Sequence, residues 1–442
     1  MTTHQKAHVA SRRSEVDMYN PESRMTIISA PRLLASYAGT ASRWVRRPLA
    51  VLLGASLLVG CSDSDGGDKA GPAPTPISDG GGGGEVSPPP STDNGSLPPL
   101  PDVLPRYLAF TVNNGFKLID DLGVDNDIYF TSKIPRFIEP DGQLCALFRE
   151  RHLLGIVDYQ HFFATANVGG GAAGVEAALA EPTALYTYFE EFKESLKAID
   201  ACGVPVIYAL EADPMSMAMN QAKREWDFDP TKFPARIHDS GHPDAIASGA
   251  PDSFAGFCKV LEYLRDVYAP GVLLAPTIKV WATSGAAQTK NEPEGGWATA
   301  DGPKADANFW MRMGVHWDLL TTNWAPKERL SYDVYRSWAR YFAAVASAMG
   351  TRVFIWKTDI QAEHLDASIP VSEWNYNLPQ YYFDDAQYLA DLGYVILAFG
   401  YGVQMSDSMS PAIGCWLQEY YGGKEGNCVP HSGTIGKVML PE

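Results

Sequence analysis

The chain of 442 residues carries 35 Lys and Arg against 52 Asp and Glu, a formal net charge of −17 at pH 7. A surface this acidic repels phosphate backbones, so we expect no nucleic-acid partner. The length and the aromatic content of 11% are sufficient for one large domain with a substantial core.

Residues 1–61 are predicted to be a signal peptide and not part of the packed domain. Three arginines precede an apolar stretch, residues 48–60, that is too short to cross a bilayer and runs directly into Cys61. The sequence Leu-Val-Gly-Cys at its end resembles the lipobox of bacterial lipoproteins. The resemblance implies acylation of Cys61 and a chain anchored by lipid to the outer membrane of the cell envelope, either periplasmic or surface-exposed.

Residues 62–104 are predicted to be a flexible linker. They consist largely of Gly, Pro, Ser and Asp, and such a composition cannot bury enough apolar surface to offset the entropy of ordering. The folded domain is therefore predicted to span residues 105–442. Residues 1–61 carry a net charge of +5, so the chain beyond Cys61 carries −22. We expect this domain to be a monomer.

Apolar runs of strand length alternate with segments of helical periodicity along this domain. Amphipathic helical faces are predicted over residues 185–199, 254–268 and 334–349, and left-handed glycine caps at Gly203, Gly271, Gly350 and Gly393. Eight strands are predicted, over residues 107–112, 127–132, 153–157, 204–210, 272–278, 318–322, 352–356 and 394–399.

Continuous apolar strands covered by amphipathic helices indicate a parallel sheet that is buried on both faces. Eight strands in a domain of this size favour a (β/α)8 barrel, the TIM-type barrel, over an open doubly wound sheet. No glycine-rich phosphate loop follows the first strand, so a nucleotide-binding fold is not expected and no cofactor is predicted.

Polar and aromatic residues follow the predicted strands, and in a barrel the carboxyl ends of the strands form the rim where active sites are built. Ten of the eleven tryptophans lie between Trp226 and Trp416, and exposed indoles can stack on the apolar faces of sugars, although any one of them also fits core packing. The predicted substrate-binding residues are Asn113, Asp158, His161, Trp281, Asn323, Trp324, Trp356, Lys357 and Tyr401.

Residues 204–214, VPVIYALEADP, place two carboxylates at the end of a buried strand. Strand alternation puts Glu211 on the same side as Ala209, facing the barrel mouth, with Asp213 one step further out. A carboxyl among apolar groups has its ionised form disfavoured, which suits a general acid. The alternatives are a structural ion pair for Glu211 and a helix-capping role for Asp213.

An acid at the end of the fourth strand and another after a late strand resembles the layout of glycoside hydrolases built on this barrel. The resemblance covers residues 105–442 and implies cleavage of an oligosaccharide or polysaccharide, with Glu211 as proton donor and Asp359 as the first-choice second carboxylate. Asp213 and Asp318 are further candidates. The chain departs from the large retaining clan, which has Asn before the first acid and Glu in place of Asp359.

Two other functions stay open, a non-catalytic glycan-binding lipoprotein and a metal-dependent hydrolase on the same barrel. The metal alternative depends on residues 236–244, RIHDSGHPD, which group two histidines and two aspartates. A glycine and a proline inside the segment prevent a helix that presents both histidines on one face, so no metal is predicted. A structural calcium is a related alternative, with Asp227, Asp229 and Asp239 as ligands.

Five cysteines remain beyond Cys61, and in an exported chain some of them are expected to pair. Cys415 and Cys428 are the predicted disulfide, and the odd count leaves at least one free thiol. Cys202 and Cys258 are predicted to be small core residues and not nucleophiles, because no activating base lies near them in the sequence.

Overall fold

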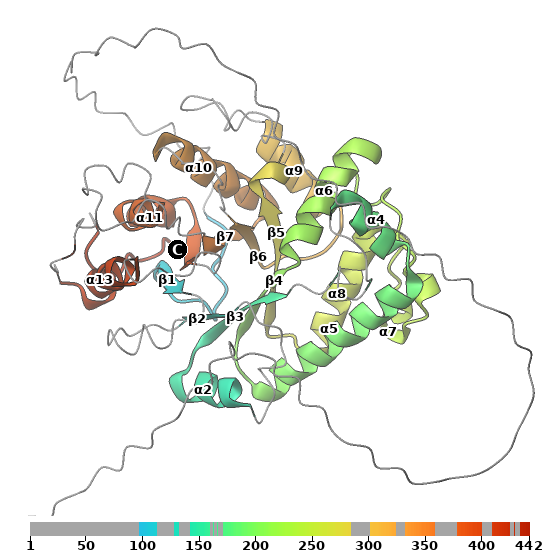
Figure 1. The fold of residues 1–442 in the computed structure, drawn as a ribbon, viewed down its shortest axis with the longest axis horizontal. Coiled ribbons are helices and arrows are strands. Elements are labelled where there is room, and N and C mark those ends of the chain that lie inside the picture. The colour runs from blue at the N-terminus through green and yellow to red at the C-terminus, as the bar shows by residue number, and fades with distance from the viewer. Residues whose placement is uncertain are drawn as a thin grey trace, which may run out of the picture. The chain divides into compact units, whose positions relative to one another are not determined.

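Eight parallel strands form one curled sheet in the computed structural model of the chain (Figure 1). The structure describes residues 97–112, 128–131, 142–159, 162, 166, 171–283, 301–323, 332–358, 378–399, 409–424, 428 and 434–442. The strands are β1 (Ala109–Val112), β2 (Ile128–Thr131), β3 (Leu154–Tyr159), β4 (Val206–Leu210), β5 (Val272–Lys279), β6 (Leu319–Asn323), β7 (Arg352–Thr358) and β8 (Tyr394–Phe399). Each overlaps a strand predicted from the sequence.

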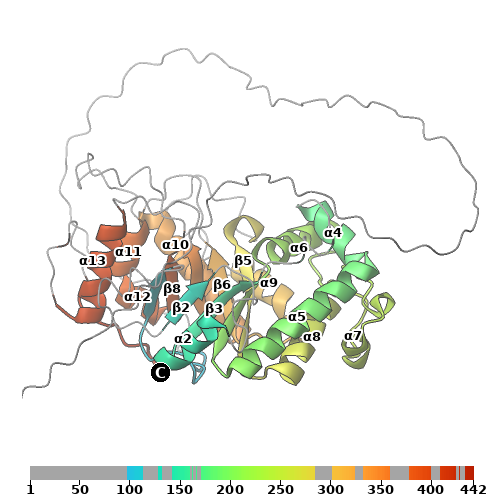
Figure 2. The same cartoon turned by 60° about the horizontal axis from the view of Figure 1, so that its bottom comes forward.

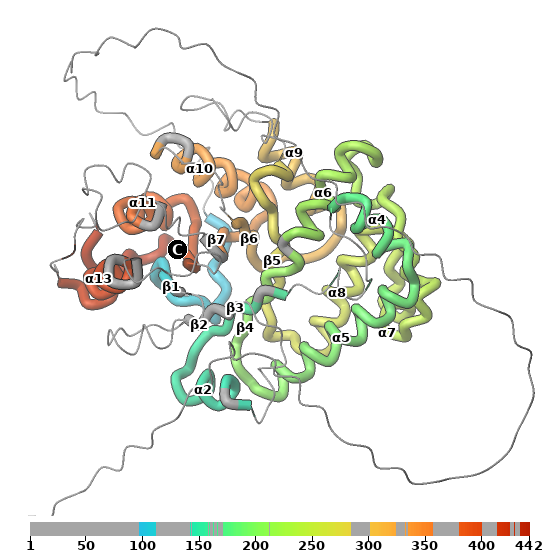
Figure 3. The backbone as a smooth tube through the Cα atoms, in the orientation of Figure 1, coloured from blue at the N-terminus to red at the C-terminus, as the bar shows by residue number. Residues whose placement is uncertain are grey.

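The strand order closes the sheet on itself. The strands pair in the order β1-β8-β7-β6-β5-β4-β3-β2, and every pairing is parallel. The two end strands of this order, β1 and β2, lie next to each other. The predicted (β/α)8 barrel is therefore confirmed, and Figure 3 shows the blue strand β1 next to the red C-terminal helices.

Helices connect the strands and cover the outside of the sheet (Figures 1 and 2). The three predicted helical faces are confirmed in α5, α8 and α10. None of the helices in the described part of the chain is both long and apolar enough to span a membrane. The helices are α2 (Gln143–Arg151), α4 (Ala172–Leu179), α5 (Pro182–Cys202), α6 (Ala212–Glu225), α7 (Pro243–Ala247), α8 (Phe254–Tyr268), α9 (Asp301–Met311), α10 (Tyr332–Met349), α11 (Leu378–Asp384), α12 (Ala386–Asp391) and α13 (Met409–Gly422), with short 3-10 turns η2 (His238–Ser240) and η3 (Val280–Ala282).

Three of the four predicted glycine caps have the left-handed backbone that such caps need. Gly203 after α5, Gly350 after α10 and Gly393 after α12 have φ of 67°, 73° and 89°. The prediction for Gly271 was wrong, because α8 already ends at Tyr268 and its C-cap is Ala269, which has φ −156°. Ala269 precedes a proline, and the residue before a proline is driven out of the helical region.

The outer and inner faces of the strands follow from one hydrogen bond. The hydroxyl of Tyr208 in β4 donates to Oγ of Ser195 in α5 at 2.9 Å, which places Tyr208 on the outer, helix-covered face. Ala209 therefore points inward, because strand residues alternate. Residues that are paired between parallel strands share a face, so the register carries this assignment through Ala275 in β5 to Thr277 and to its partner in β6, Thr321.

Both ends of the described chain lie at the amino ends of the strands. Arg352, the first residue of β7, donates to the carbonyls of Pro98 at 2.6 Å and Pro441 at 3.0 Å. Leu104, next to the predicted boundary at residue 105, is buried. The final residues return to this end through a bridge between Tyr107 and Met439, and Figure 2 marks the C-terminus there.

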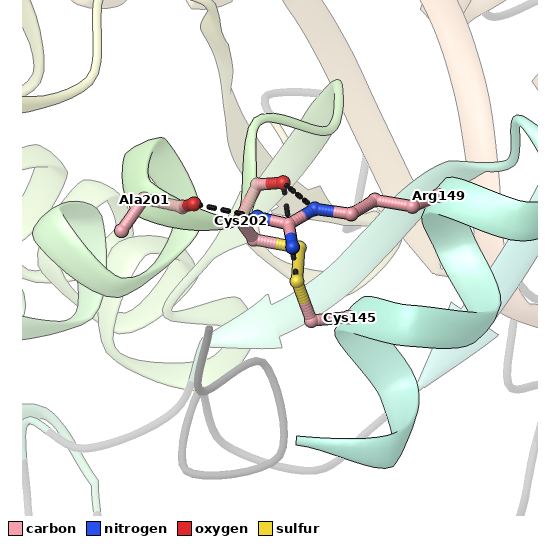
Figure 4. Close-up of a disulfide and its surroundings, with 4 residues drawn as sticks. All are labelled: Cys145, Arg149, Ala201 and Cys202. Atoms are coloured by element: carbon pink, nitrogen blue, oxygen red, sulfur yellow. Dashed lines mark hydrogen bonds between the residues drawn. A yellow bond between two sulfur atoms is a disulfide. The ribbon is translucent and has the colours of Figure 1, made fainter. Parts of the chain in front are cut away.

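Two disulfides connect elements on the outside of the barrel. The predicted bond between Cys415 and Cys428 is present. Cys202 is buried in the core as predicted, and it also pairs with Cys145 in α2, 57 positions away in the chain (Figure 4). The side chain of Arg149 also bonds to the carbonyl of Cys202, at 2.6 Å. Cys258 is free and buried, in agreement with its predicted place in the core.

Candidate functional site

The turn from β4 into α6 is formed by Glu211. Its backbone is left-handed, with φ 41° and ψ 62°, which is rare for a residue with a side chain. The N–H of Glu211 donates to the carbonyl of Tyr159 at 2.8 Å, and its own carbonyl accepts from the N–H of Met215 at 2.8 Å. Backbone strain of this kind costs on the order of 1–3 kcal/mol and concentrates at functional sites.

The carboxyl of Glu211 is buried, with 1% of the residue exposed. Its Oε1 accepts a hydrogen bond from the backbone N–H of Phe162 at 3.1 Å. Burial, and next the charge of Glu211, raise the pKa of the phenols of Tyr159 and Tyr188 well above their usual range. This acid therefore lies within electrostatic reach of two buried tyrosines.

Those tyrosines belong to the outer side of the sheet. The ring of Tyr159 packs against Phe192 of α5, with ring centroids 5.1 Å apart, and Tyr188 is itself in α5. The inward direction predicted for Glu211 stays a prediction, because the electrostatic influence on these tyrosines does not fix where its carboxyl points. Alternation holds only along an extended backbone, and the left-handed turn at Glu211 interrupts it.

Asp213 lies in the first turn of α6 and does not cap the helix, because the N-cap position is occupied by Glu211. Its carboxylate forms an ion pair with Lys279, the last residue of β5. Ser216 also joins α6 to this strand, since its hydroxyl donates to the carbonyl of Thr277 at 3.1 Å and accepts from the N–H of Lys279 at 2.9 Å. The start of α6 is thereby fixed against the carboxyl end of β5.

Asp318 lies at the opposite end of the barrel from Glu211, at the amino ends of the strands. It directly precedes β6 and so stands at the amino end of that strand. Its Oδ2 accepts from Arg265 at 2.8 Å and from the N–H of Leu274 at 2.8 Å. The candidacy of Asp318 as a catalytic acid is corrected by this position, and we assign it a structural role between α8, β5 and β6.

The predicted substrate-binding residues differ in how accessible they are. Trp281 in η3 follows β5 and is 43% exposed. Trp356 is 1% exposed within β7, so its ring packs in the core and is not available to stack on a sugar. Asn323 ends β6 and is 6% exposed. Asp158 and Lys357 are placed in β3 and β7 by their backbone only, while Asn113, His161, Trp324, Asp359, Tyr401 and Cys61 lie outside the described residues.

Replacement Trp281→Ala is expected to weaken binding of a carbohydrate ligand roughly 2- to 10-fold, the range for loss of one ring contact. The melting temperature should fall by at most a few degrees, because 43% of the residue is exposed and only part of its packing is lost. Affinity electrophoresis in gels containing soluble polysaccharide, alongside a thermal melt, measures both. Unchanged migration of the variant in a gel that retards the wild type would exclude Trp281 from the ligand site.

Two threonines that were not identified from the sequence also face the barrel interior near its carboxyl end. Thr277 and Thr321 are fully buried, and the register pairs them directly across β5 and β6. Within apolar strands a threonine is ordinarily read as a strand former, so only the pairing register could have brought these two together. With Asn323, they form a neutral polar set on the inner wall.

The loop considered as a metal site has protein partners for its charged groups. His242 is fully buried and its Nε2 lies 3.0 Å from Oε2 of Glu190. His238 contacts Asp252 at 3.1 Å, and Asp239 is paired with Arg236 at 2.8 Å. The carboxylate of Asp244 accepts from the hydroxyl of Tyr268 at 3.0 Å. Within the part of the chain that is described, no group of three or more His, Cys, Asp or Glu could hold a metal ion.

Neither family models nor curated proteins match this chain. Similar solved structures include a double mutant of the Cellulomonas fimi endo-β-1,4-mannanase, with a TM-score of 0.38, 12% identity and coverage of 72% of each chain. A chitinase from Pseudoalteromonas aurantia has a TM-score of 0.37 and 10% identity, over 70% of this chain and 97% of its own. A D-allulose 3-epimerase from Methylomonas sp. has a TM-score of 0.33 and 11% identity, over 72% and 89%. Likeness at this level supports no inference about activity.

Proposed function

We propose that the chain is a glycoside hydrolase that cleaves a neutral oligosaccharide or polysaccharide, with Glu211 as general acid and base. The observation that supports this most directly is a buried carboxyl on a left-handed residue at the carboxyl end of β4. Barrel enzymes build their active sites at this end, and strained backbone is characteristic of catalytic residues. An exposed indole, Trp281, lies after the neighbouring strand β5.

Cleavage of a glycosidic bond needs two carboxyl groups. In the proposed reaction Glu211 donates its proton to the leaving oxygen as the bond to the anomeric carbon breaks. The second carboxylate attacks that carbon or removes a proton from the attacking water. Asp359 is the proposed second carboxylate, because it comes one residue after the end of β7. A carboxyl separation of about 5 Å would give retention, and one of about 6.5–9.5 Å inversion.

The burial of Glu211 favours one rival function, a lipoprotein that binds glycan without cleaving it. In that case the carboxyl only fixes the turn by accepting from the N–H of Phe162. Replacement Glu211→Gln distinguishes the two, because glutamine keeps an acceptor for that N–H and has no titratable proton to donate. The measurement is hydrolysis of mannan, xylan, chitin and cellulose by the wild type and the variant.

We further propose that the protein works outside the cytoplasm, attached to the membrane by lipid on Cys61. Two disulfides in the folded part support an oxidising compartment, where such bonds persist. Acidic composition and a Gly/Pro-rich segment after Cys61 fit a tethered domain.

Replacement Cys61→Ser is expected to move most of the protein from the membrane pellet to the soluble fraction, because acylation requires the thiol. Fractionation of bacterial cells that express each form, together with incorporation of labelled palmitate, provides the measurement. Cys258→Ser is the matched control, since it removes the free buried thiol and should leave fractionation unchanged. Sedimentation of the Cys61→Ser protein with membranes, as for the wild type, would contradict the anchor.

A further inference from the structure

Three polar atoms on the inner wall of the barrel are buried and have no hydrogen-bond partner among the described residues. They are Oγ1 of Thr277, Oγ1 of Thr321 and Oδ1 of Asn323. The two threonines are fully buried and Asn323 is 6% exposed. Thr277 pairs with Thr321 across β5 and β6, and Asn323 lies two residues beyond Thr321 on the same face. The three atoms therefore belong to one surface at the carboxyl end of the barrel.

The next residue on the same strand behaves differently. Thr322 faces the outer side, and its hydroxyl donates to the carbonyl of Ile278 at 2.9 Å. Buried polar groups in folded proteins are nearly always paired, and an unpaired one is costly. Thr277, Thr321 and Asn323, unlike Thr322, therefore need a partner beyond the described residues, and water or a ligand can supply it.

We propose that Thr277, Thr321 and Asn323 form the binding site for the terminal ring of a neutral sugar. This deepens the proposed function and rests on it for the class of ligand. A threonine hydroxyl both donates and accepts, and the Asn oxygen accepts, so together they match the hydroxyl groups of a sugar.

The charge of the described residues around this site disfavours an acidic ligand. All three side chains are neutral, and the neighbouring Lys279, which pairs with Asn323 in the strand register, has its charge compensated by Asp213. A uronate carboxylate would enter this buried surface without a free cation among these residues, and an unpaired buried charge is strongly disfavoured. Neutral hexoses and pentoses are therefore expected to bind in preference to uronates.

The depth of the site specifies which part of the ligand it binds. Thr321 lies two residues below Asn323 along β6, which is about 7 Å at roughly 3.3 Å per residue. Contact with both residues requires a ligand that enters the barrel by about one ring. The end of a sugar chain can do this, whereas the middle of a chain lying across the rim cannot.

Two threonine variants on adjacent residues of one strand test the site. Thr321→Val removes the inward hydroxyl, and Thr322→Val removes the outward one that is already paired. Titration calorimetry of the full-length chain with D-mannose, D-xylose, D-glucose and D-glucuronate measures binding, and a thermal melt measures stability. Thr277→Val is a second variant of the same site.

We expect at least one neutral sugar to bind the wild type, and D-glucuronate not to bind. Thr321→Val and Thr277→Val should each weaken that binding roughly tenfold, the loss expected for one hydrogen bond, without lowering the melting temperature. Thr322→Val should bind like the wild type and melt at a lower temperature. This crossed pattern distinguishes a ligand contact from a structural hydroxyl.

The inference is overturned if no neutral sugar binds, or if the inward variants bind as tightly as the wild type, in which case the threonines contact only water. The same measurements distinguish failure of the sugar-binding site from failure of the catalytic proposal. Hydrolysis that depends on Glu211 but is unaffected by Thr321→Val and Thr277→Val would remove this site alone. Threonine-dependent sugar binding without any hydrolysis would remove only the catalytic role of Glu211.

Discussion

The Glu211→Gln protein is expected to hydrolyse a susceptible polysaccharide about 100- to 10,000-fold more slowly than the wild type, the usual contribution of a general acid or base. Glutamine retains the oxygen that accepts from the N–H of Phe162, so the turn at the end of β4 should persist. The loss should appear mainly in kcat, because proton transfer occurs in the transition state, while sugar binding should be largely kept. Reducing-end assays and titration calorimetry on the same preparations measure the two effects.

The matched control for this variant is Asp318→Asn, which neutralises a different acid at the other end of the barrel. It weakens the ion pair with Arg265, so the unfolding free energy should fall by about 3 kcal/mol, while kcat of the folded protein stays unchanged. Wild-type rates in the Glu211→Gln protein would reject Glu211 as the acid. An equal loss of rate in both variants would show that the effect comes from unfolding.

Removal of the disulfide in the double variant Cys145→Ala/Cys202→Ala is expected to lower the unfolding free energy by about 4 kcal/mol. The bond closes a chain segment with a sequence separation of 57, and in the chain-entropy model the stabilisation grows with the logarithm of that length. Urea unfolding of both forms under oxidising conditions measures the difference.

The second disulfide supplies the comparison. Cys415→Ala/Cys428→Ala opens a segment with a separation of 13, and the same model gives about 3 kcal/mol. We therefore expect both variants to be destabilised, and the unfolding free energy of the variant without Cys145–Cys202 to be lower by about 1 kcal/mol. A smaller loss for Cys145–Cys202 than for Cys415–Cys428 would contradict the loop-length explanation, and the hydrogen bonds from Arg149 to this corner would then be the first alternative cause.

The barrel could be predicted because its strands are mostly apolar runs, which is typical of strands buried on both faces. The run that became β4 also correctly placed Glu211 at a strand end. The direction of its side chain could not be predicted, because alternation assumes an extended backbone and Glu211 is left-handed. In the same way, Pro270 ends α8 before the glycine that was predicted to cap it.

Contacts between distant parts of the chain were beyond the sequence alone. Cys145 and Cys202 meet because α2 and the end of α5 come together, and no spacing rule relates two cysteines 57 residues apart. The pairing of Thr277 with Thr321 likewise depends on the register between β5 and β6. Asp318 was proposed for its residue type, although its place before the strand put it at the amino end.

The hydrogen bonds from Arg352 to Pro98 and Pro441 determine at which end of the barrel an upstream tether would join the folded domain. Because residue 97 lies at the amino ends of the strands, any upstream tether would join the barrel at this end. The carboxyl end of the barrel, with Asn323 and Trp281, lies opposite this point of entry. Insoluble or very long glycans could thus be met from the far side, without first threading between the protein and its anchor.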